Sequence, residues 1–165
     1  MTITSRASSA LTHTVASLAT SSGRTVGRCS AEYDNTTNKD EEVAAGVLFT
    51  TGTTPTAGGN IEAWVFQVRE DGTWPDIFTA SYSGSDGGFT VRSRDHLRAG
   101  AALLGAVPVL STSDLPYVLS PKNVAQLLGV NLVRKFTVFV THSTGVNANS
   151  TSSNHETTVS PSYWA

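Results

Sequence analysis

Alternating hydrophobic and polar positions predict several β-strands along this chain. The clearest alternation lies in NIEAWVFQVRE (60–70), where Ile61 and Val65 share one face and Trp64 lies on the other. Both faces carry mostly apolar side chains, so this strand is expected to be central in its sheet and covered on both sides. The stretch NLVRKFTVFVTHST (131–144) shows the same two-sided pattern.

Less regular patterns predict further strands, separated by turns rich in Gly, Pro, Asn and Asp. These strands cover residues 23–30, 41–52, 77–83, 89–95, 98–111 and 155–165, with the last one ended by Pro161. Residues 13–20 form a short apolar segment of weak periodicity. The Ala- and Gly-rich segment 98–111 could be taken for a helix, but Gly105 and Pro108 favour a strand with a bend or bulge.

One helix is expected, in SPKNVAQLLG (120–129). Ser120 is a suitable N-cap and Pro121 a suitable first helical residue. Gly129 stands where a helix commonly ends in the left-handed conformation. This helix would connect two strands.

About eight short strands without a repeated β–α alternation predict an all-β fold. The expected architecture is an antiparallel β-sandwich, jelly-roll-like, with one short helix in a connection. At 165 residues the chain has room for one domain, assigned to residues 13–165. Residues 1–12 are expected to form a flexible or partner-bound N-terminal arm.

Charge and composition narrow the classes of partner. Only 15% of residues are charged and the net charge is −2, so direct binding of nucleic acid is not expected. No apolar run is long enough to span a membrane, and the N-terminus does not have the pattern of a secretory signal. Synthesis and folding in a cytoplasm are therefore expected. The single cysteine, Cys29, is expected to be a buried apolar side chain.

The stretch VTHSTGVNANSTSSNHE (140–156) places His142 and His155 at the two ends of a polar loop, with Glu156 next. These three residues could ligate zinc. No third His or Cys lies nearby in the sequence, so structural hydrogen bonding of the histidines is the preferred interpretation. The loop itself is typical of a contact element.

Other polar groups are expected to be structural. The run KDEE (39–42) could bind calcium but lacks the spacing of a calcium loop, so a solvated strand entry is expected. Ser93, Asp95 and His96 would point to opposite faces of a strand, which excludes a catalytic triad there. Turn carboxylates that could in principle form a glycosidase pair are expected to bond their own backbone instead; they are Asp71, Asp76 and Asp86. No catalytic residue, metal site or cofactor is predicted.

Six residues are candidates for a protein interface. Trp74 and Pro75 share a turn, and Tyr163 and Trp164 lie at the C-terminus just before Ala165; aromatic residues are enriched at interface centres. Arg92 and Arg94, near Arg98, form a basic cluster that is either a solvated strand face or a site for an acidic partner. An alternative is sugar binding, with Trp64, Trp74 and Tyr82 stacking on sugar rings.

The long stretch from DNTTN (34–38) through TTGTTPTAGGNIE (50–62) to WVFQVREDGTWPD (64–76) resembles small virion proteins of tailed bacteriophages. SPKNVAQLLGV (120–130) followed by FTVFVTHSTGVNANSTSSNHE (136–156) extends the resemblance, which covers roughly residues 12 to 160. It implies a capsid decoration or cementing protein on the outer capsid surface. The expected partners are the major capsid protein and further copies of this chain, in a dimer or trimer. A tail-associated or carbohydrate-binding module is the alternative.

Overall fold

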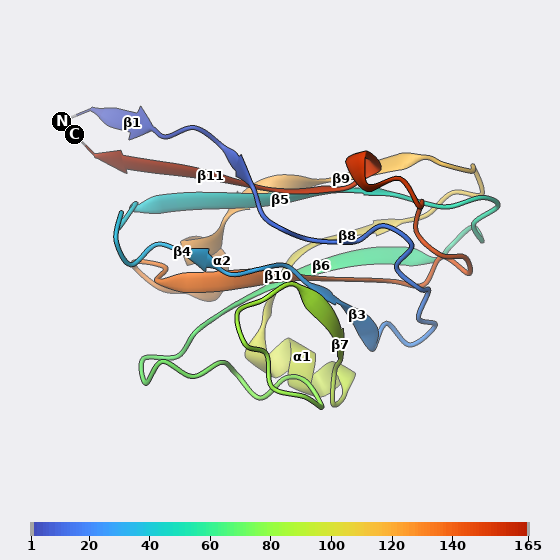
Figure 1. The fold of residues 1–165 in the computed structure, drawn as a ribbon, viewed down its shortest axis with the longest axis horizontal. Coiled ribbons are helices and arrows are strands. Elements are labelled where there is room, and N and C mark those ends of the chain that lie inside the picture. The colour runs from blue at the N-terminus through green and yellow to red at the C-terminus, as the bar shows by residue number, and fades with distance from the viewer. Residues whose placement is uncertain (1, 165) are drawn as a thin grey trace.

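Two antiparallel β-sheets packed face to face form the body of the molecule (Figure 1). The computed structural model describes residues 2–164. Sheet A has the strand order β1-β11-β5-β9, with β2 also paired to β11; its strands are β1 (Ile3–Ser5), β2 (Ser9–Ala10), β5 (Glu42–Thr50), β9 (Pro116–Asn123) and β11 (Glu156–Trp164). Sheet B has the order β7-β3-β10-β6-β8, with β4 also on β10; its strands are β3 (Val26–Cys29), β4 (Tyr33–Asp34), β6 (Asn60–Gln67), β7 (Gly87–Thr90), β8 (Ala102–Pro108) and β10 (Lys135–His142).

The long connections cross from one sheet to the other. β5 leads to β6, β8 to β9, β9 through the helix α2 (Val124–Leu128) to β10, and β10 to β11. A second helix, α1 (Arg94–Gly100), precedes β8, and a 3₁₀ turn, η1 (Ser152–Asn154), precedes β11. The predicted fold class, an all-β antiparallel sandwich, is confirmed, although it holds two short α-helices rather than one.

The main core lies between the two sheets. It contains Phe49 of β5, Val159 of β11 and Phe136 of β10, all fully buried. On β6 the residues that face this core are Ile61, Ala63 and Val65, as the alternation predicts. Burial of these apolar side chains is the principal source of the sandwich's stability.

A second core covers the other face of sheet B. Residues 68–101, which we name the cover, contain α1 and β7; β7 is the edge strand of sheet B, and the rest of the cover lies below that sheet in Figure 1. The side chains of this second core come from both the sheet and the cover; they are Cys29, Trp64, Phe66, Phe139, Ile77, Phe78, Tyr82, Val91 and Leu97. β6 is thus buried on both faces, as predicted, and β10 is buried on both faces as well. Cys29 is a buried apolar side chain, also as predicted.

Two segments of the cover differ from the predicted strands. Residues 77–83 make only an isolated bridge, between Phe78 and Val91, and their aromatic side chains enter the second core. In the predicted strand 89–95, Ser93 instead caps helix α1 by accepting a hydrogen bond from the His96 backbone. An N-cap serine competes effectively with strand pairing at such a position.

Two prolines also lie in strands where the sequence predicted otherwise. Pro121 belongs to β9, at a bulge where its ring packs over Gly46, and the helix begins three residues later with Asn123 as its N-cap. Gly129 does end this helix, with φ 67°. Pro161 does not end β11. The Pro161 carbonyl accepts a hydrogen bond from the Arg6 backbone, in the gap between β1 and β2. The N–H that proline lacks would point into the same gap, so its absence breaks no strand pairing.

The N-terminal segment lies along the edge of sheet A. β1 and β2 both pair with β11, and the Leu11 backbone donates to the Thr157 carbonyl. The assignment of residues 1–12 as a separate arm stays a prediction, and residues 1 and 165 lie outside the described part. Within residues 2–164, no helix has the length and apolar character needed to cross a membrane.

Candidate functional site

The Trp74–Pro75 turn lies on the surface of the cover. The Trp74 ring is half-buried and meets Phe66 and Tyr82 edge-on, with ring centroids 5.7 and 4.8 Å away. A shallow pocket of about 450 Å³ beside it is lined by Thr73, Trp74, Pro75, Asp76, Phe78, Ala80, Ser81 and Tyr82. Arg92 joins this region through its ion pair with Asp76, at 2.9 Å. Three of the six interface candidates therefore lie together.

Arg94 belongs instead to a charged cluster with Glu62 and Trp64 of sheet B. Its guanidinium lies 2.8 Å from a carboxylate oxygen of Glu62 and 5.3 Å from the centre of the Trp64 ring. Arg24 approaches the other oxygen of Glu62 at 2.7 Å, and the Trp64 indole donates to Glu62. Arg98 pairs with Asp95. Each arginine of the predicted basic cluster thus pairs with an acid within the chain, and Arg94 shares its acid with Arg24.

Tyr163 and Trp164 lie at the end of β11 in sheet A, on the other side of the sandwich from the cover (Figure 1). Trp164 pairs with Ile3, and both side chains are about half exposed. The ring of Tyr163 lies 4.4 Å from the Arg6 guanidinium. Arg6 in turn forms an ion pair of 2.7 Å with Asp40, which is fully buried. The expectation that residues 39–42 form a solvated strand entry is therefore wrong for Asp40.

The two histidines of the polar loop are structural. Their strands belong to different sheets, yet both rings contact Phe49, at 5.0 and 5.4 Å between centroids. His142 bonds the Leu18 carbonyl and the Thr144 hydroxyl; His155 accepts from the Thr50 backbone and bonds the Asn149 carbonyl. Burial lowers the pKa of His142 to about 4. Within the described residues, no group of three or more His, Cys, Asp or Glu side chains could hold a metal.

The remaining acids and Ser93 are also structural. Asp71 bonds the backbone and hydroxyl of Thr73 in its own turn, as predicted. Asp86 differs, because it receives two hydrogen bonds from Arg28 and two from Thr14. Ser93 lies 2.8 Å from His96 in a helix cap rather than on a strand, and Asp95 pairs with Arg98. These three residues therefore do not line up as a triad, although for a different reason from the one expected.

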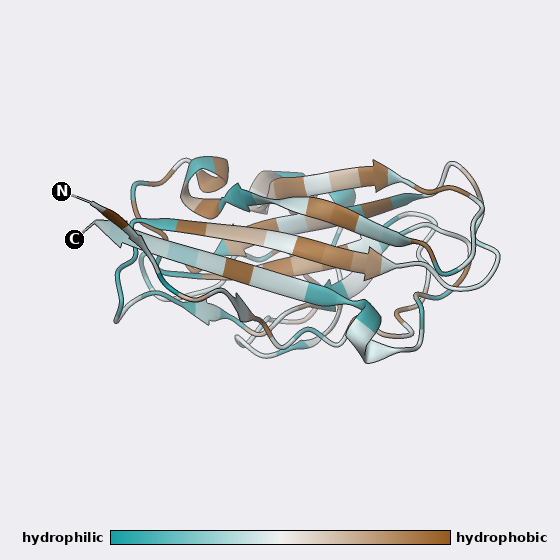
Figure 2. Ribbon diagram, turned by 90° about the horizontal axis from the view of Figure 1, so that it is seen from above, coloured by the Kyte–Doolittle hydropathy of each residue, from teal (hydrophilic) through white to brown (hydrophobic). Residues whose placement is uncertain are grey.

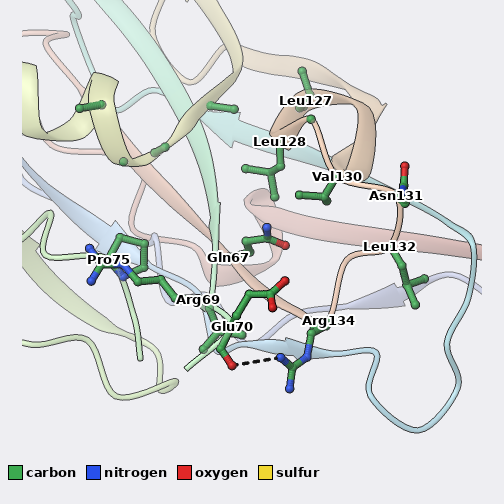
Figure 3. Close-up of a pocket in the computed structure, with 16 residues that line it drawn as sticks. Gln67, Arg69, Glu70, Pro75, Leu127, Leu128, Val130, Asn131, Leu132 and Arg134 are labelled. Atoms are coloured by element: carbon green, nitrogen blue, oxygen red, sulfur yellow. Dashed lines mark hydrogen bonds between the residues drawn. The ribbon is translucent and has the colours of Figure 1, made fainter. Parts of the chain in front are cut away.

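No pattern in the sequence predicts a groove of about 920 Å³ between the end of β6, the cover and the α2–β10 loop (Figure 3). Leu127, Leu128, Val130 and Leu132 form an apolar wall on the loop side. Arg69, Glu70 and Arg134 supply its charges, and Arg134 reaches the Glu70 carbonyl at 3.5 Å. The residues that line the groove come from three separate parts of the chain, 67–75, 99–102 and 127–134, so no local motif marks them.

The outer face of sheet A is the other feature without a motif. No described element packs over it, whereas the outer face of sheet B carries the cover (Figures 1 and 2). We name it the open face. Its residues project from β5, β9 and β11 and from the paired ends of β1 and β11; the largest apolar ones are Leu48, Val118, Ile3 and Trp164.

Comparisons with known proteins place the chain in no family. No family model and no curated protein matches it. Among solved structures, it is similar to the VP2 subviral particle of infectious bursal disease virus, with 11% identity and a TM-score of 0.26 over 97% of this chain and 40% of that one. A mutant VP2 of the same virus, in T=1 particles, is 10% identical with a TM-score of 0.15, over 98% of this chain and 34% of that one. The chain spans less than half of either protein, and TM-scores this low carry no argument about function.

Proposed function

We propose that this protein is a non-enzymatic structural component of a tailed-bacteriophage virion. In this role it is a decoration or cementing protein that binds the outer surface of the major capsid protein shell, as a dimer or trimer. The resemblance of residues 12 to 160 to small phage virion proteins motivates the proposal. The structural observation that supports it is the open face, because a rigid sandwich with one bare sheet suits a protein that works through contact.

Binding of this kind stabilises a shell by mass action. A ligand that binds only the assembled state lowers the free energy of that state and leaves the free subunits unchanged. Such a ligand needs a stiff body and a contact surface, and the two cores around sheet B supply the stiffness. A repeated shell lattice lets one modest contact act many times.

The location of the protein on purified virions tests the proposal. We expect cryo-electron microscopy to show density for a two-sheet sandwich at repeated positions on the outside of the capsid. Density confined to the tail, or none on the virion, would contradict it.

A carbohydrate-binding or tail-associated module is the second candidate, and one observation favours it. Half-buried Trp74 lines a shallow pocket together with polar Thr73, Asp76 and Ser81, a setting that suits a sugar ring. Against it, Trp64 and Tyr82 are buried in the second core. A glycan screen separates the two: binding that Trp74→Ala abolishes would support the module.

A further inference from the structure

The side chains of the open face follow from strand register. On β11, Thr157, Val159 and Pro161 are buried, so their alternating neighbours point outward; these are Glu156, Thr158, Ser160, Ser162 and Trp164. Their partners on β5 are Leu48, Gly46, Ala44 and Glu42, and Val118 of β9 lies beside Leu48. Ile3 of β1 lies beside Trp164.

The centre of this face is uncharged and partly apolar. Between Glu156 at one end and Glu42 at the other, the rows hold only small, hydroxyl or aliphatic side chains. Val118 is 67% exposed, Ile3 52% and Trp164 46%, so three of the seven exposed large hydrophobic residues lie on this one face. Val118 lies in the row of Glu156 and the Ile3–Trp164 pair lies eight residues along β11, so exposed apolar side chains stand at both ends of the face.

The carboxylates of Glu42 and Glu156 give the open face a negative charge. Glu42 pairs in register with Ser162, six residues along β11 from Glu156, so the two lie roughly 20 Å apart along the strand direction. Lys122 pairs with the inward-pointing Ala45 and is exposed at the β9 edge of the sheet. In Figure 2, which looks onto sheet A, hydrophilic colour is mostly at the strand ends, with white and brown between.

The dimensions suit one protein contact. Four strands across, at about 4.8 Å each, and nine residues along, at about 3.4 Å each, give a rectangle of roughly 600 Å² before side-chain relief is added. Stable interfaces bury about 800 Å² per partner. The open face, with the projecting Ile3–Trp164 pair, therefore approaches the size of a standard interface.

We infer that the open face is the surface that docks on the capsid shell, against a patch that is uncharged at its centre and carries Lys or Arg side chains opposite Glu42 and Glu156. This inference rests on the proposed function and names the site and the chemistry of its partner. A second copy of this chain fits the face poorly. Stacking it on itself brings four carboxylates together without a facing cation, and like charges in an interface oppose association.

Co-sedimentation with shells of the encoding phage that lack this protein tests the inference. Val118→Lys, at an exposed position that does not support the fold, is expected to weaken binding at least tenfold, and Glu42→Lys to weaken it severalfold. Leu110→Lys is the matched control, because Leu110 is 61% exposed but lies in the β8–β9 connection, away from the face. It is expected to bind within twofold of the unmodified protein.

Each outcome has a distinct meaning. If the unmodified protein fails to bind shells, the proposed function falls and the docking face falls with it. If it binds, but Val118→Lys and Glu42→Lys bind equally well, only the face is overturned. The molar mass of the free variants is measured alongside, and we expect Val118→Lys to leave it unchanged. A self-associated form that Val118→Lys dissociates would identify a second copy as the occupant and also overturn the inference.

Discussion

At the scale of single residues, the buried histidines make the stability of this protein sensitive to acid. His142 is fully buried, and burial lowers its pKa from 6.5 to about 4. Burial lowers the pKa of His155 as well. The folded state therefore binds fewer protons than the unfolded chain between these pH values, so stability is full above pH 6.5 and falls as the pH drops toward 4. For His142 alone the loss is about 3 kcal/mol.

Chemical denaturation between pH 7 and pH 4 measures this loss. We expect His142→Gln to be less stable at pH 7, because the Leu18 carbonyl and the Thr144 hydroxyl lose their ring partner, but to show a shallower fall with pH. His96→Gln is the control, since His96 is exposed on α1. An unchanged pH slope in His142→Gln would show that His142 does not titrate as its burial requires.

The Glu62 cluster gives a second residue-scale prediction. Glu62→Gln keeps the shape of the side chain but leaves Arg24 and Arg94 without their shared carboxylate, so we expect a loss of about 2 kcal/mol in the free energy of unfolding. Asp76→Asn removes the exposed partner of Arg92 and is expected to change stability by less than about 0.5 kcal/mol. If Glu62→Gln and Asp76→Asn lowered the free energy of unfolding equally, burial of the acid would not decide how much an ion pair stabilises this protein.

Sequence patterns located some of these residues but not their partners. Alternation on strand 60–70 predicted that Trp64 lies on a covered face, and the composition predicted a buried Cys29. Neither pattern could predict that Glu62 pairs with Arg24, or that Asp40 pairs with Arg6, because these contacts join residues that are 38 and 34 positions apart in the sequence. Such pairs depend on strand register across a sheet, which no local pattern specifies.

At the scale of elements, the pairing of β3 with β10 depends on a close approach at Gly27. A Cβ atom there would lie 2.3 Å from the Val140 carbonyl oxygen and 2.6 Å from the Phe139 ring. We expect Gly27→Ala to lower the free energy of unfolding by at least about 3 kcal/mol, because backbone and a buried ring must both move. Thermal and urea denaturation measure the effect.

Gly88 on the neighbouring strand is the matched control. It faces open space, with its nearest neighbour 4.0 Å from an added Cβ. Gly88→Ala is expected to change stability by less than about 1 kcal/mol, in either direction. If both substitutions were tolerated equally, β3 and β10 would not be as close as the structure has them.

The elements that could be predicted are those whose pattern and packing agree. β6 and β10 alternate strongly and are buried on both faces, so their sequences and their environments give the same answer. α1 was missed because its cap, Ser93, follows a strand-like run and the helix has only seven residues. The helix α2 was predicted too early because Pro121, a good first helical residue, also fits a bulge in a strand over Gly46.

At the scale of the whole molecule, sheet B contributes side chains to two separate cores, one on each of its faces. The main core joins both sheets and draws on strands from residue 43 to residue 159. The second core is mostly built from the cover and the outer face of sheet B. Because the only regular elements of the cover are the four-residue strand β7 and the seven-residue helix α1, the cover is expected to open at a lower free energy than the sandwich.

Two fully buried leucines, one in each core, test this order by native-state hydrogen exchange. Leu104 of β8 faces the main core and Leu97 of α1 faces the second. Each change to Ala is expected to lower global stability by about 2 to 5 kcal/mol. Leu104→Ala should leave the opening free energy of cover amides unchanged, because Leu104 stays buried when only the cover opens. Leu97→Ala should lower it along with global stability. If Leu104→Ala lowered the protection of cover amides as much as that of β5 amides, the two cores would unfold as one unit.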